Sequence, residues 1–577
     1  MDDLISSTLD RVARLCEADY YDYIVIGSGM GGGILARTLV EHPEKPRVLI
    51  IERGGLLLHT HCMNLATPRW NYGSLTGPSQ NNDYVYSKLK DSFMTVTAKS
   101  ETYAGGPVYG LGGRSTVWGL FSPKIDEDQL QVFPPAVRDY LRGDGYEKAY
   151  KLMTNDAKAS HDRPYPEDFN GIDTNVHDEI IKTLNQIQNF DGQNLCFRRS
   201  PMAVEFTARD PGSKLYHILQ GGYSTVPWIL DQVLNNSEHL NLLAQTRVIT
   251  VNKANLNQSR IESLTVHNQH GKERTFSVGN ATVILSAGTI DTAAIALRSG
   301  VEKDNPLVGR GLTDHDIWGT RFMFQARADV DQLMGQALKL QTTTKLHKTP
   351  YPIPLENQEA KLPSTQETVV SEYQESNTSG NPETSSLLTV TVNASSFLGY
   401  STERAFSCQY IDSRMHVVQQ SVFFEDDKKT TTEPTTVQVV FLLPATLKEE
   451  NRVLNRPDSI PSIQFTKEDT SIYATHMQIL AERIRDKLAG QVIRTAPVPQ
   501  LSRSPFGVVA HEVGTMRMGV NPGERVVDDN LRVHNFQNLF VCDLSVLPIS
   551  PSSNPSLTLA ALAQRLGHHL ETRRKNE

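Results

Sequence analysis

The stretch that decides the fold reads Tyr21-Asp22-Tyr23-Ile24-Val25-Ile26-Gly27-Ser28-Gly29-Met30-Gly31-Gly32. Its first half is apolar, which predicts a buried strand, and its second half has the pattern G-x-G-x-x-G and opens a predicted helix. That helix must end before Pro43, because a proline ring cannot continue it. A second apolar strand, 48–51, follows and ends in Glu52. The order of strand, glycine turn, helix, strand and acid predicts one βαβ unit.

The glycines of this unit have separable tasks. Gly27 permits the tight turn, Gly29 lets the backbone approach a pyrophosphate, and Gly32 allows the helix to pack closely on the strand. The helix N-terminus then offers unpaired N–H groups to the phosphates. Glu52 lies 23 residues after Gly29, where a carboxylate accepts hydrogen bonds from the adenosine ribose and repels a 2′-phosphate. The unit therefore predicts dinucleotide binding and disfavours NADP, but it does not separate FAD from NAD.

The composition limits the other possibilities. A chain of 577 residues exceeds one ordinary core, so two domains are expected. The chain has 57 basic and 65 acidic residues, a net charge of −8, and no basic stripe, which argues against a nucleic-acid partner. No run reaches the roughly 18 apolar residues of a membrane span. The acidic N-terminus and five scattered cysteines favour a cytoplasmic location.

Further segments have recognisable periodicity. Apolar spacing predicts helices at 4–18, 291–299 and 470–488, and strands at 240–251, 262–267 and 281–288. A polar segment, 355–386, predicts a flexible insertion because it has little apolar surface to bury. Beyond it, 387–398, 405–424 and 435–446 suit an antiparallel sheet that forms one wall of a substrate chamber.

Four motifs carry a resemblance to a known family. They are Glu52-Arg53-Gly54-Gly55, Gly112-Gly113-Arg114-Ser115-Thr116, His511-Glu512-Val513-Gly514-Thr515 and Ser553-Asn554-Pro555-Ser556-Leu557-Thr558. Together they resemble the glucose-methanol-choline (GMC) oxidoreductase family, and the chain looks most like its pyranose oxidase branch. The similarity is clear over about residues 20–55, 103–123, 280–315 and 505–570.

The resemblance implies an α/β fold with two domains. A Rossmann-like FAD-binding domain is then assembled from the non-contiguous segments 1–60, 100–125, 210–315 and 500–577. An α+β substrate-binding domain with a mostly antiparallel sheet takes 61–99, 126–209 and 316–499. FAD is the implied cofactor.

The resemblance also implies the site residues. Val248 and Ala287 approach the adenosine end, Asp543 lies near the ribityl chain and pyrophosphate, and residues 112–119 pass beside the flavin ring. The implied cofactor-binding set is Gly27, Gly29, Gly32, Glu52, Arg53, Gly112, Gly113, Ser115, Thr116, Val117, Trp118, Val248, Ala287, Asp543 and Asn554.

Two departures from the pyranose oxidase pattern have chemical consequences. Val117 stands where those enzymes have a histidine that attaches covalently to FAD, and valine has no nucleophilic atom. We therefore expect FAD to be held non-covalently. Gly119 replaces a threonine near the flavin N5, which leaves the electron acceptor open between oxygen and a quinone-like compound.

Alcohol oxidation by a flavin needs a proton removed from oxygen and a hydride delivered from carbon. A neutral imidazole suits the first task, so His511 is the predicted general base. Asn554 is the predicted polar partner that holds the substrate oxygen. Two alternatives remain open, namely that His511 is a buried structural histidine and that Asn554 only initiates a turn before Pro555.

Two other groups of residues have possible functional roles. Asp314-His315-Asp316 resembles a metal cluster, but three adjacent residues do not easily converge on one ion, so no metal is assigned. Gln409 and Tyr410, in the expected chamber wall, are candidates for contacts to sugar hydroxyls.

The sequence therefore predicts an FAD-dependent oxidation of a secondary hydroxyl, at C2 or C3, of a pyranose sugar or glycoside. Three alternatives stay open: a biosynthetic sugar oxidoreductase that makes a kojic-acid-type pyranone, an alcohol dehydrogenase or lyase on the same scaffold with a non-sugar substrate, and an NAD-linked dehydrogenase. The oligomeric state is not predicted.

Overall fold

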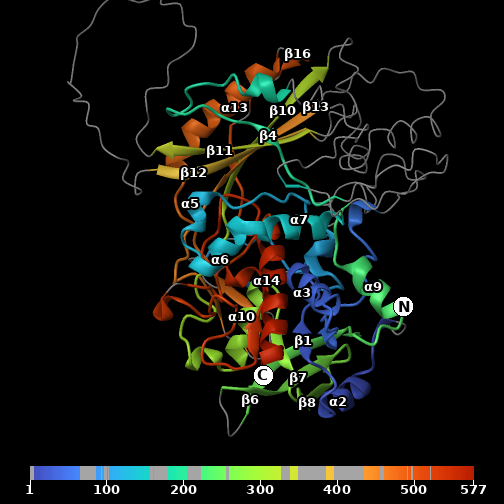
Figure 1. The fold of residues 1–577 in the computed structure, drawn as a ribbon. Coiled ribbons are helices and arrows are strands. Elements are labelled where there is room, and N and C mark those ends of the chain that lie inside the picture. The colour runs from blue at the N-terminus through green and yellow to red at the C-terminus, as the bar shows by residue number, and fades with distance from the viewer. Residues whose placement is uncertain are drawn as a thin grey trace, which may run out of the picture.

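The computed structural model is organised around two large β-sheets, one above the other in Figure 1. It describes residues 5–64, 86, 88–91, 94–95, 100–101, 103–155, 160–161, 180–204, 222–254, 259–326, 338–347, 385–394, 435–454, 456, 461–489, 492–495, 498, 500–519 and 521–576. The predicted insertion lies outside these residues over 355–384, and so does the predicted strand 405–424.

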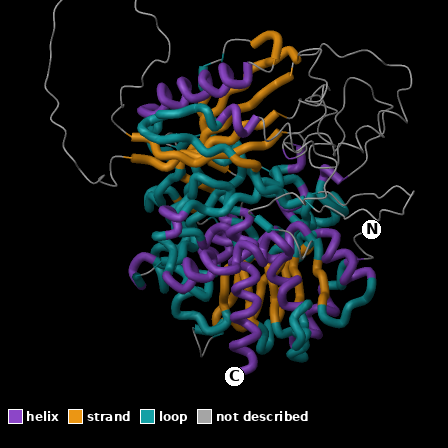
Figure 2. Tube along the Cα trace, turned by 45° about the horizontal axis from the view of Figure 1, so that its top comes forward, coloured by secondary structure: helices purple, strands orange, loops and turns teal. Residues whose placement is uncertain are grey.

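The lower sheet has five parallel strands. They are β1 (Tyr23–Ile26), β2 (Val48–Ile51), β5 (Leu240–Leu243), β9 (Thr282–Leu285) and β18 (Leu539–Val541). Their order is β18-β9-β1-β2-β5. Every residue of β1 and β2 is buried, as expected for strands that are covered on both faces. Figure 2 shows these strands running between helices.

The two ends of the chain meet in this lower layer. Helix α3 (Met30–Val40) starts at the glycine turn, and the C-terminal helix α14 (Ser556–Asn576) packs against it. The Tyr23 hydroxyl donates a hydrogen bond to the buried Glu571 carboxylate at 2.8 Å. Strand β18 adds the C-terminal region to the sheet edge beside β9. The sheet therefore places segments more than 500 residues apart next to one another.

The upper sheet is antiparallel and has seven strands. They are β4 (Arg198–Arg199), β10 (Asp316–Ala326), β11 (Leu338–His347), β12 (Ser385–Ala394), β13 (Thr435–Leu443), β16 (Val492–Thr495) and β17 (Ser502–Arg503). Helix α13 (Ala474–Ala489) packs on it and buries Met477, Leu480 and Ile484 against strand residues such as Phe441. A parallel Rossmann-like sheet with a separate antiparallel sheet confirms the predicted α/β fold class.

Two smaller sheets and several helices complete the described parts of the chain. One sheet contains β6 (Thr246–Lys253), β7 (Ile261–Asn268) and β8 (Glu273–Ser277), and the other contains β3 (Met94–Thr95), β14 (Arg452–Leu454) and β15 (Ser462–Gln464). The remaining α-helices are α2 (Leu9–Glu17), α5 (Glu127–Leu130), α6 (Pro135–Tyr140), α7 (Tyr146–Thr154), α9 (Val226–Leu234) and α10 (Thr289–Arg298). Among the described helices, none is both long and apolar enough to cross a membrane.

The predicted strand 240–251 is wrong as a single element. Leu240–Leu243 belongs to the parallel sheet, whereas β6 begins at Thr246 and belongs to the three-stranded antiparallel sheet. Gln245 breaks the run because it adopts a left-handed backbone with φ of 52°. Because of this break, the chain leaves the parallel sheet after β5 and enters the three-stranded antiparallel sheet at β6.

Candidate active site

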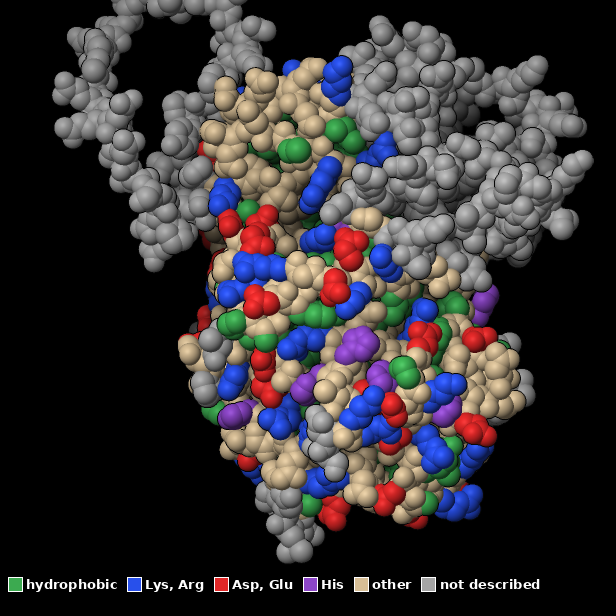
Figure 3. Space-filling model, viewed as in Figure 1, with side chains coloured by type: hydrophobic (Ala, Val, Ile, Leu, Met, Phe, Trp, Pro, Cys, Tyr) green, Lys and Arg blue, Asp and Glu red, His purple; other side chains and the backbone are tan. Residues whose placement is uncertain are grey.

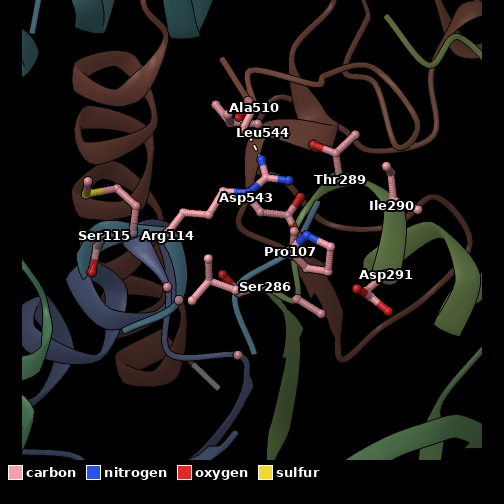
Figure 4. A pocket seen from close by; sticks show the side chains of 18 of the residues that line it. Pro107, Arg114, Ser115, Ser286, Thr289, Ile290, Asp291, Ala510, Asp543 and Leu544 are labelled. Carbon is pink, nitrogen blue, oxygen red and sulfur yellow. Dashed lines mark hydrogen bonds between the residues drawn. The ribbon is translucent and has the colours of Figure 1, made fainter. Parts of the chain in front are cut away.

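A cavity of about 330 Å³ lies where β1, β2 and β9 end. Segments from the N-terminal part, the middle and the C-terminal part of the chain line it, among them 26–27, 29–31, 51–53, 107–109, 113–115, 117–119, 246–248, 286–291, 508–512 and 543–544, together with Asn554. Figure 4 shows part of this lining, with Ser286, Thr289 and Asp291 arranged around the opening. Ligand sites of open α/β sheets are found at this edge, outside the carboxyl ends of the strands.

The first helix presents its N-terminus to the cavity. Gly29 is the N-cap of α3, and no side chain caps the helix there. A Cβ on Gly29 would meet no atom within 4 Å, whereas a Cβ on Gly31 would lie 1.9 Å from the Cys542 carbonyl oxygen. A Cβ on Gly32 would lie 2.0 Å from the Gly27 oxygen, and Gly32 does not line the cavity. Gly29 therefore leaves space for a ligand, whereas Gly31 and Gly32 allow close backbone packing.

Glu52 ends β2 and is buried beside this helix start. Its Oε2 accepts hydrogen bonds from the Ser28 N–H at 3.0 Å and the Ser28 hydroxyl at 2.6 Å. Its Oε1 accepts one from the Gly54 N–H at 2.9 Å. Burial raises the pKa of Glu52, and the hydrogen bonds from Gly54 and Ser28 oppose this. Sequence reasoning missed Ser28, although it lies between the motif's glycines.

A second group of charged residues gathers near Glu52. The Arg53 guanidinium lies 3.5 Å from the centre of the Tyr109 ring, and Arg53 Nη1 is 3.5 Å from Asp291 Oδ1. The Tyr109 hydroxyl donates to Asp291 Oδ2 at 2.9 Å. Val248 and Ala287 line the cavity as well. Arg53, Val248 and Ala287 were predicted here, but Tyr109 and Asp291 carried no sequence signal for a site.

Asp543 lines the cavity and joins the loop after β18 to the start of α10. Its Oδ2 accepts hydrogen bonds from the Gly288 N–H at 3.0 Å and the Thr292 hydroxyl at 2.5 Å. Its Oδ1 accepts bonds from the Ser545 N–H at 3.0 Å and the Ser545 hydroxyl at 2.5 Å. Burial raises the pKa of Asp543, and these donors oppose the shift. The carboxylate therefore fixes the loop after β18 against the start of α10.

The second glycine cluster crosses the cavity as a 3₁₀ turn at Gly113–Thr116. Gly112 has φ of +81°, and its N–H donates to the Ser28 hydroxyl at 2.9 Å. Gly113, Ser115, Val117 and Trp118 line the cavity, whereas Gly112 and Thr116 do not. Thr116 instead donates its hydroxyl to the Gly113 carbonyl at 2.8 Å.

The motif that contains His511 is anchored to the start of α10. The Thr289 hydroxyl donates to the Glu512 carbonyl at 2.5 Å, and the Thr515 hydroxyl donates to the Thr289 carbonyl at 2.6 Å. Gly514 has φ of +95°, a conformation that L side chains rarely adopt. His511 lines the cavity, and so does Asn554, two residues before the start of α14.

The structure brings His511 and Asn554 together. Asn554 Nδ2 lies 3.4 Å from His511 Nε2, and both residues line the cavity. His511 Nδ1 lies 3.0 Å from His315 Nε2. Burial lowers the pKa of His511 well below its usual value, and His315 and Arg114 lower it further. His511 is therefore neutral near pH 7 and can accept a proton.

A partly buried ion pair lies beside His511. Arg114 Nη1 donates to Glu512 Oε2 at 2.6 Å and to the Ala510 carbonyl at 2.7 Å. The Tyr103 hydroxyl donates to Glu512 Oε1 at 2.5 Å. Figure 4 shows Arg114 extending across the cavity to Ala510. Arg114 and Tyr103 were not predicted as site residues, because their partners lie about 400 residues away in the sequence.

Two family models match this chain, and both are described as GMC oxidoreductase. The N-terminal model matches residues 220–317, and the C-terminal model matches residues 463–563. The second range contains both His511 and Asn554. The chain belongs to the GMC oxidoreductase family. This is a family of FAD-binding enzymes that act on CH–OH groups.

Similar GMC oxidoreductases include two curated enzymes. The alcohol dehydrogenase (acceptor) of Pseudomonas putida is 24% identical over 51% of this chain, and the alignment spans only 53% of that enzyme. A long-chain-alcohol oxidase of Arabidopsis thaliana is 23% identical over 98% of this chain and 70% of the oxidase.

Two solved structures share the fold. Formate oxidase from Aspergillus oryzae matches with a TM-score of 0.61 and 16% identity, covering 96% of this chain and 99% of the other. Pyridoxine 4-oxidase from Mesorbium loti matches with a TM-score of 0.56, 16% identity and the same coverage. The likeness extends over both large sheets and places this chain in the same architecture.

The cavity of this GMC oxidoreductase fits FAD. Its volume lies within the range of about 300–1,000 Å³ that is usual for ligand sites. The uncapped N-terminus of α3 offers N–H groups to a pyrophosphate. The buried Arg53 Nη1 atom makes no hydrogen bond among the described residues, although it lies 3.5 Å from Asp291 Oδ1. A helix N-terminus and an arginine at one cavity suit an anionic dinucleotide.

The remaining predicted site residues have different outcomes. Gln409 and Tyr410 lie outside the described residues. Of the Asp-His-Asp run, Asp314 and His315 lie close to His511, with their ligating atoms all within 4.8 Å of one another. Asp316 instead pairs with Lys467 at 3.1 Å and with Arg503 at 2.9 Å. The absence of a metal at this cluster stays a prediction.

Proposed function

We propose that this protein oxidises an alcohol with FAD, using His511 as the base that removes the hydroxyl proton. The observation that carries the proposal is the 3.4 Å approach of Asn554 Nδ2 to His511 Nε2 at the wall of the cavity. A substrate hydroxyl placed between the two groups would donate its proton to the imidazole and accept a hydrogen bond from the amide.

FAD and the side chains around the cavity have separate roles in the proposed reaction. FAD, when bound, supplies the redox chemistry by accepting the hydride from the substrate carbon. Asn554 holds the substrate oxygen, which is a positioning effect. His511 accepts the proton at Nε2, because its lowered pKa keeps the imidazole neutral in the free enzyme. The side chains of Val117 and Trp118 line the same cavity.

We propose that FAD is bound without a covalent link. Val117, which stands at the position of the attaching histidine in pyranose oxidases, is buried and offers no nucleophile. Precipitation with trichloroacetic acid should therefore release all flavin into the supernatant. A yellow pellet that keeps its flavin after washing in acid would contradict this prediction.

For the substrate, we propose a secondary hydroxyl of a pyranose at C2 or C3, the substrate of the branch that the motifs resemble. A second candidate, an apolar alcohol, has a specific observation in its favour. Val508 and Val509, close to His511 in the chain, line the cavity with exposed fractions of 39% and 37%. The name of the Arabidopsis thaliana relative, a long-chain-alcohol oxidase, agrees with this second candidate.

The electron acceptor and the location in the cell are also proposals. Oxygen is the proposed acceptor because several similar proteins are named oxidases, with a quinone-like compound as the alternative. The predicted cytoplasmic location stays a prediction. The proposed domain boundaries are those expected from the sequence.

Anaerobic reduction of the flavin tests the function directly. The absorbance of the oxidised flavin should disappear when the right alcohol is added, and a panel of pyranoses and aliphatic alcohols separates the two substrate classes. Variant His511→Ala should keep its FAD but undergo reduction on the order of a hundredfold more slowly. The matched control is His270→Ala, an exposed histidine in the turn between β7 and β8.

The outcomes exclude the alternatives separately. A colourless protein would indicate an NAD-linked dehydrogenase. A flavin that no alcohol or sugar bleaches would indicate a lyase or a structural flavin. Unchanged reduction rates in His511→Ala would remove this residue from the mechanism.

A further inference from the structure

A second imidazole lies directly behind the proposed base. His315 is 2% exposed, and its ring centre lies 4.9 Å from that of His511 with the two planes at 81°. His315 directly precedes β10, and it does not line the cavity. It cannot touch the substrate, so any effect on the reaction must pass through His511.

The hydrogen bonds of His315 determine which of its nitrogens carries the proton. His315 Nδ1 lies 3.0 Å from the Pro551 carbonyl oxygen. A carbonyl only accepts, so Nδ1 must be the nitrogen that carries hydrogen. Burial lowers the pKa of His315 to about 4, so the ring is neutral and its Nε2 has a free lone pair.

The same logic extends to His511. Its Nδ1 lies 3.0 Å from His315 Nε2, which can only accept in this state. His511 must therefore carry its hydrogen on Nδ1, and its Nε2 keeps a lone pair. Asn554 Nδ2, an amide donor, faces that lone pair at 3.4 Å. Each bond in the chain Pro551, His315, His511, Asn554 has one donor and one acceptor.

The buried Asp314 offers the opposite arrangement, in which His315 would donate from Nε2. Asp314 Oδ1 lies 3.8 Å from His315 Nε2, beyond hydrogen-bond distance, whereas His511 Nδ1 lies at 3.0 Å. The shorter contact therefore determines that His511 Nδ1 donates a hydrogen bond to His315 Nε2. The ligating atoms of Asp314, His315 and His511 could also surround a metal ion, which would occupy His511 Nδ1.

We propose that His315 is a positioning residue that holds His511 in the tautomer whose Nε2 lone pair faces the substrate. The proposal rests on the proposed role of His511 as base, but the tautomer itself is a property of the protein without substrate. A third group that orients the base is a recurrent requirement of general-base catalysis. Without the acceptor at His315 Nε2, His511 could also adopt the tautomer with hydrogen on Nε2, which cannot accept the proton.

Nitrogen NMR tests the tautomer without any turnover. In protein labelled with ¹⁵N-histidine, correlation spectra distinguish protonated from unprotonated ring nitrogens, and His511→Gln and His315→Gln each remove one ring to assign it. We expect hydrogen on Nδ1 and none on Nε2 in both rings. Hydrogen on His511 Nε2 would overturn the proposal, and so would a metal ion that co-purifies in one equivalent and is lost in His315→Gln.

Two variants test the consequence for the reaction. In His315→Gln the amide oxygen can still accept from His511 Nδ1, whereas His315→Leu removes the acceptor. We expect flavin reduction to slow on the order of a hundredfold in His315→Leu, with little change in KM, and to stay within about fivefold of the wild type in His315→Gln. Equal losses in both variants would overturn the proposal. If His315→Leu fails to bind flavin, the spectra and His315→Gln decide.

The two proposals can fail separately. If no alcohol reduces the flavin but the spectra show the expected tautomers, the proposed substrate class is wrong and the positioning role of His315 stands. If alcohols reduce the flavin but His511 carries its hydrogen on Nε2, the function stands and the positioning role falls.

Discussion

At the scale of single residues, a buried carboxyl group next to the imidazole pair links stability to pH. Asp314 is 4% exposed, and burial raises its pKa to about 8. Glu512 raises this pKa further, whereas Lys467, the His315 N–H and Arg114 oppose the shift. In the unfolded chain an aspartate has a pKa of about 3.9. At a pH between about 3.9 and about 8, the folded state therefore keeps a proton on Asp314 that the unfolded state has released.

The sign of the pH effect follows from this difference. When the folded state holds more protons than the unfolded state, stability falls as pH rises. We predict that Asp314→Asn, which stays neutral, is more stable than the wild type by a larger margin at pH 8 than at pH 5, because pH 5 lies only about one unit above the pKa of an unfolded aspartate. Urea unfolding followed by fluorescence at the two pH values measures the difference.

Asp316 provides the matched control for Asp314→Asn. This neighbouring carboxylate is paired with Lys467 and Arg503, so Asp316→Asn should destabilise the protein at both pH values. An equal gain for Asp314→Asn at pH 5 and pH 8 would show that the effect is packing and not titration.

At the scale of elements, two glycines at the start of α3 have different roles: Gly29 leaves room for the ligand, and Gly31 allows close packing against the chain after β18. A Cβ at Gly29 would enter the cavity without meeting protein atoms, and its φ of −62° suits alanine. A Cβ at Gly31 would collide with the Cys542 carbonyl at 1.9 Å. We predict that Gly29→Ala weakens FAD binding at least about tenfold, or about 1.4 kcal/mol, with an unchanged apoprotein. Gly31→Ala should instead destabilise the apoprotein by about 1–3 kcal/mol.

Two measurements on the same pair of variants test this difference. Flavin titration gives the affinity, and urea unfolding of the flavin-free protein gives the stability. A Gly29→Ala protein with normal FAD affinity would remove the α3 N-terminus from the binding site. A Gly31→Ala apoprotein of normal stability would mean that α3 shifts away from β18 at little cost.

The elements that the sequence predicted well are those with a local signal. The run from Tyr23 to Ile26 is continuously apolar, and the glycine turn after it has the spacing of a helix start, so β1 and α3 could be placed from the sequence. The division between β5 and β6 could not be placed. Gln245 has no feature that distinguishes it from its neighbours, and only pairing with two different sheets breaks the strand.

The candidate site follows the same rule. His511 and Asn554 belong to short motifs, and the structure places them together. The partner of His511 at Nδ1 lies 196 residues away and is identified only in three dimensions. Likewise, no pattern near Arg114 indicates that its partner is Glu512, because a contact between distant segments leaves no periodicity in either one.

At the scale of the whole molecule, the cavity is the place where segments that are distant in the sequence lie around one ligand site. The Rossmann-like core includes residues from Ile5 to Leu570, whereas the antiparallel sheet and α13 form a separate apolar cluster. In Figure 3, charged side chains of both signs are interspersed over the lower part of the visible face. A ligand in the cavity therefore connects the first and last hundred residues through the interior of the lower layer.

Hydrogen exchange can measure this connection. We predict that FAD protects backbone amides in 27–31, 113–119, 286–291 and 508–512 together, because all four segments line the cavity. At a free FAD concentration of 100 times Kd the protein should gain about 2.7 kcal/mol of stability. Strands β11 and β12 should change less, since they pack in the separate cluster. ADP, which carries only the adenosine end and the phosphates, should protect 27–31 and 286–291 but not 508–512. Full protection of 508–512 by ADP would mean that the His511 loop does not face the flavin end of the cavity.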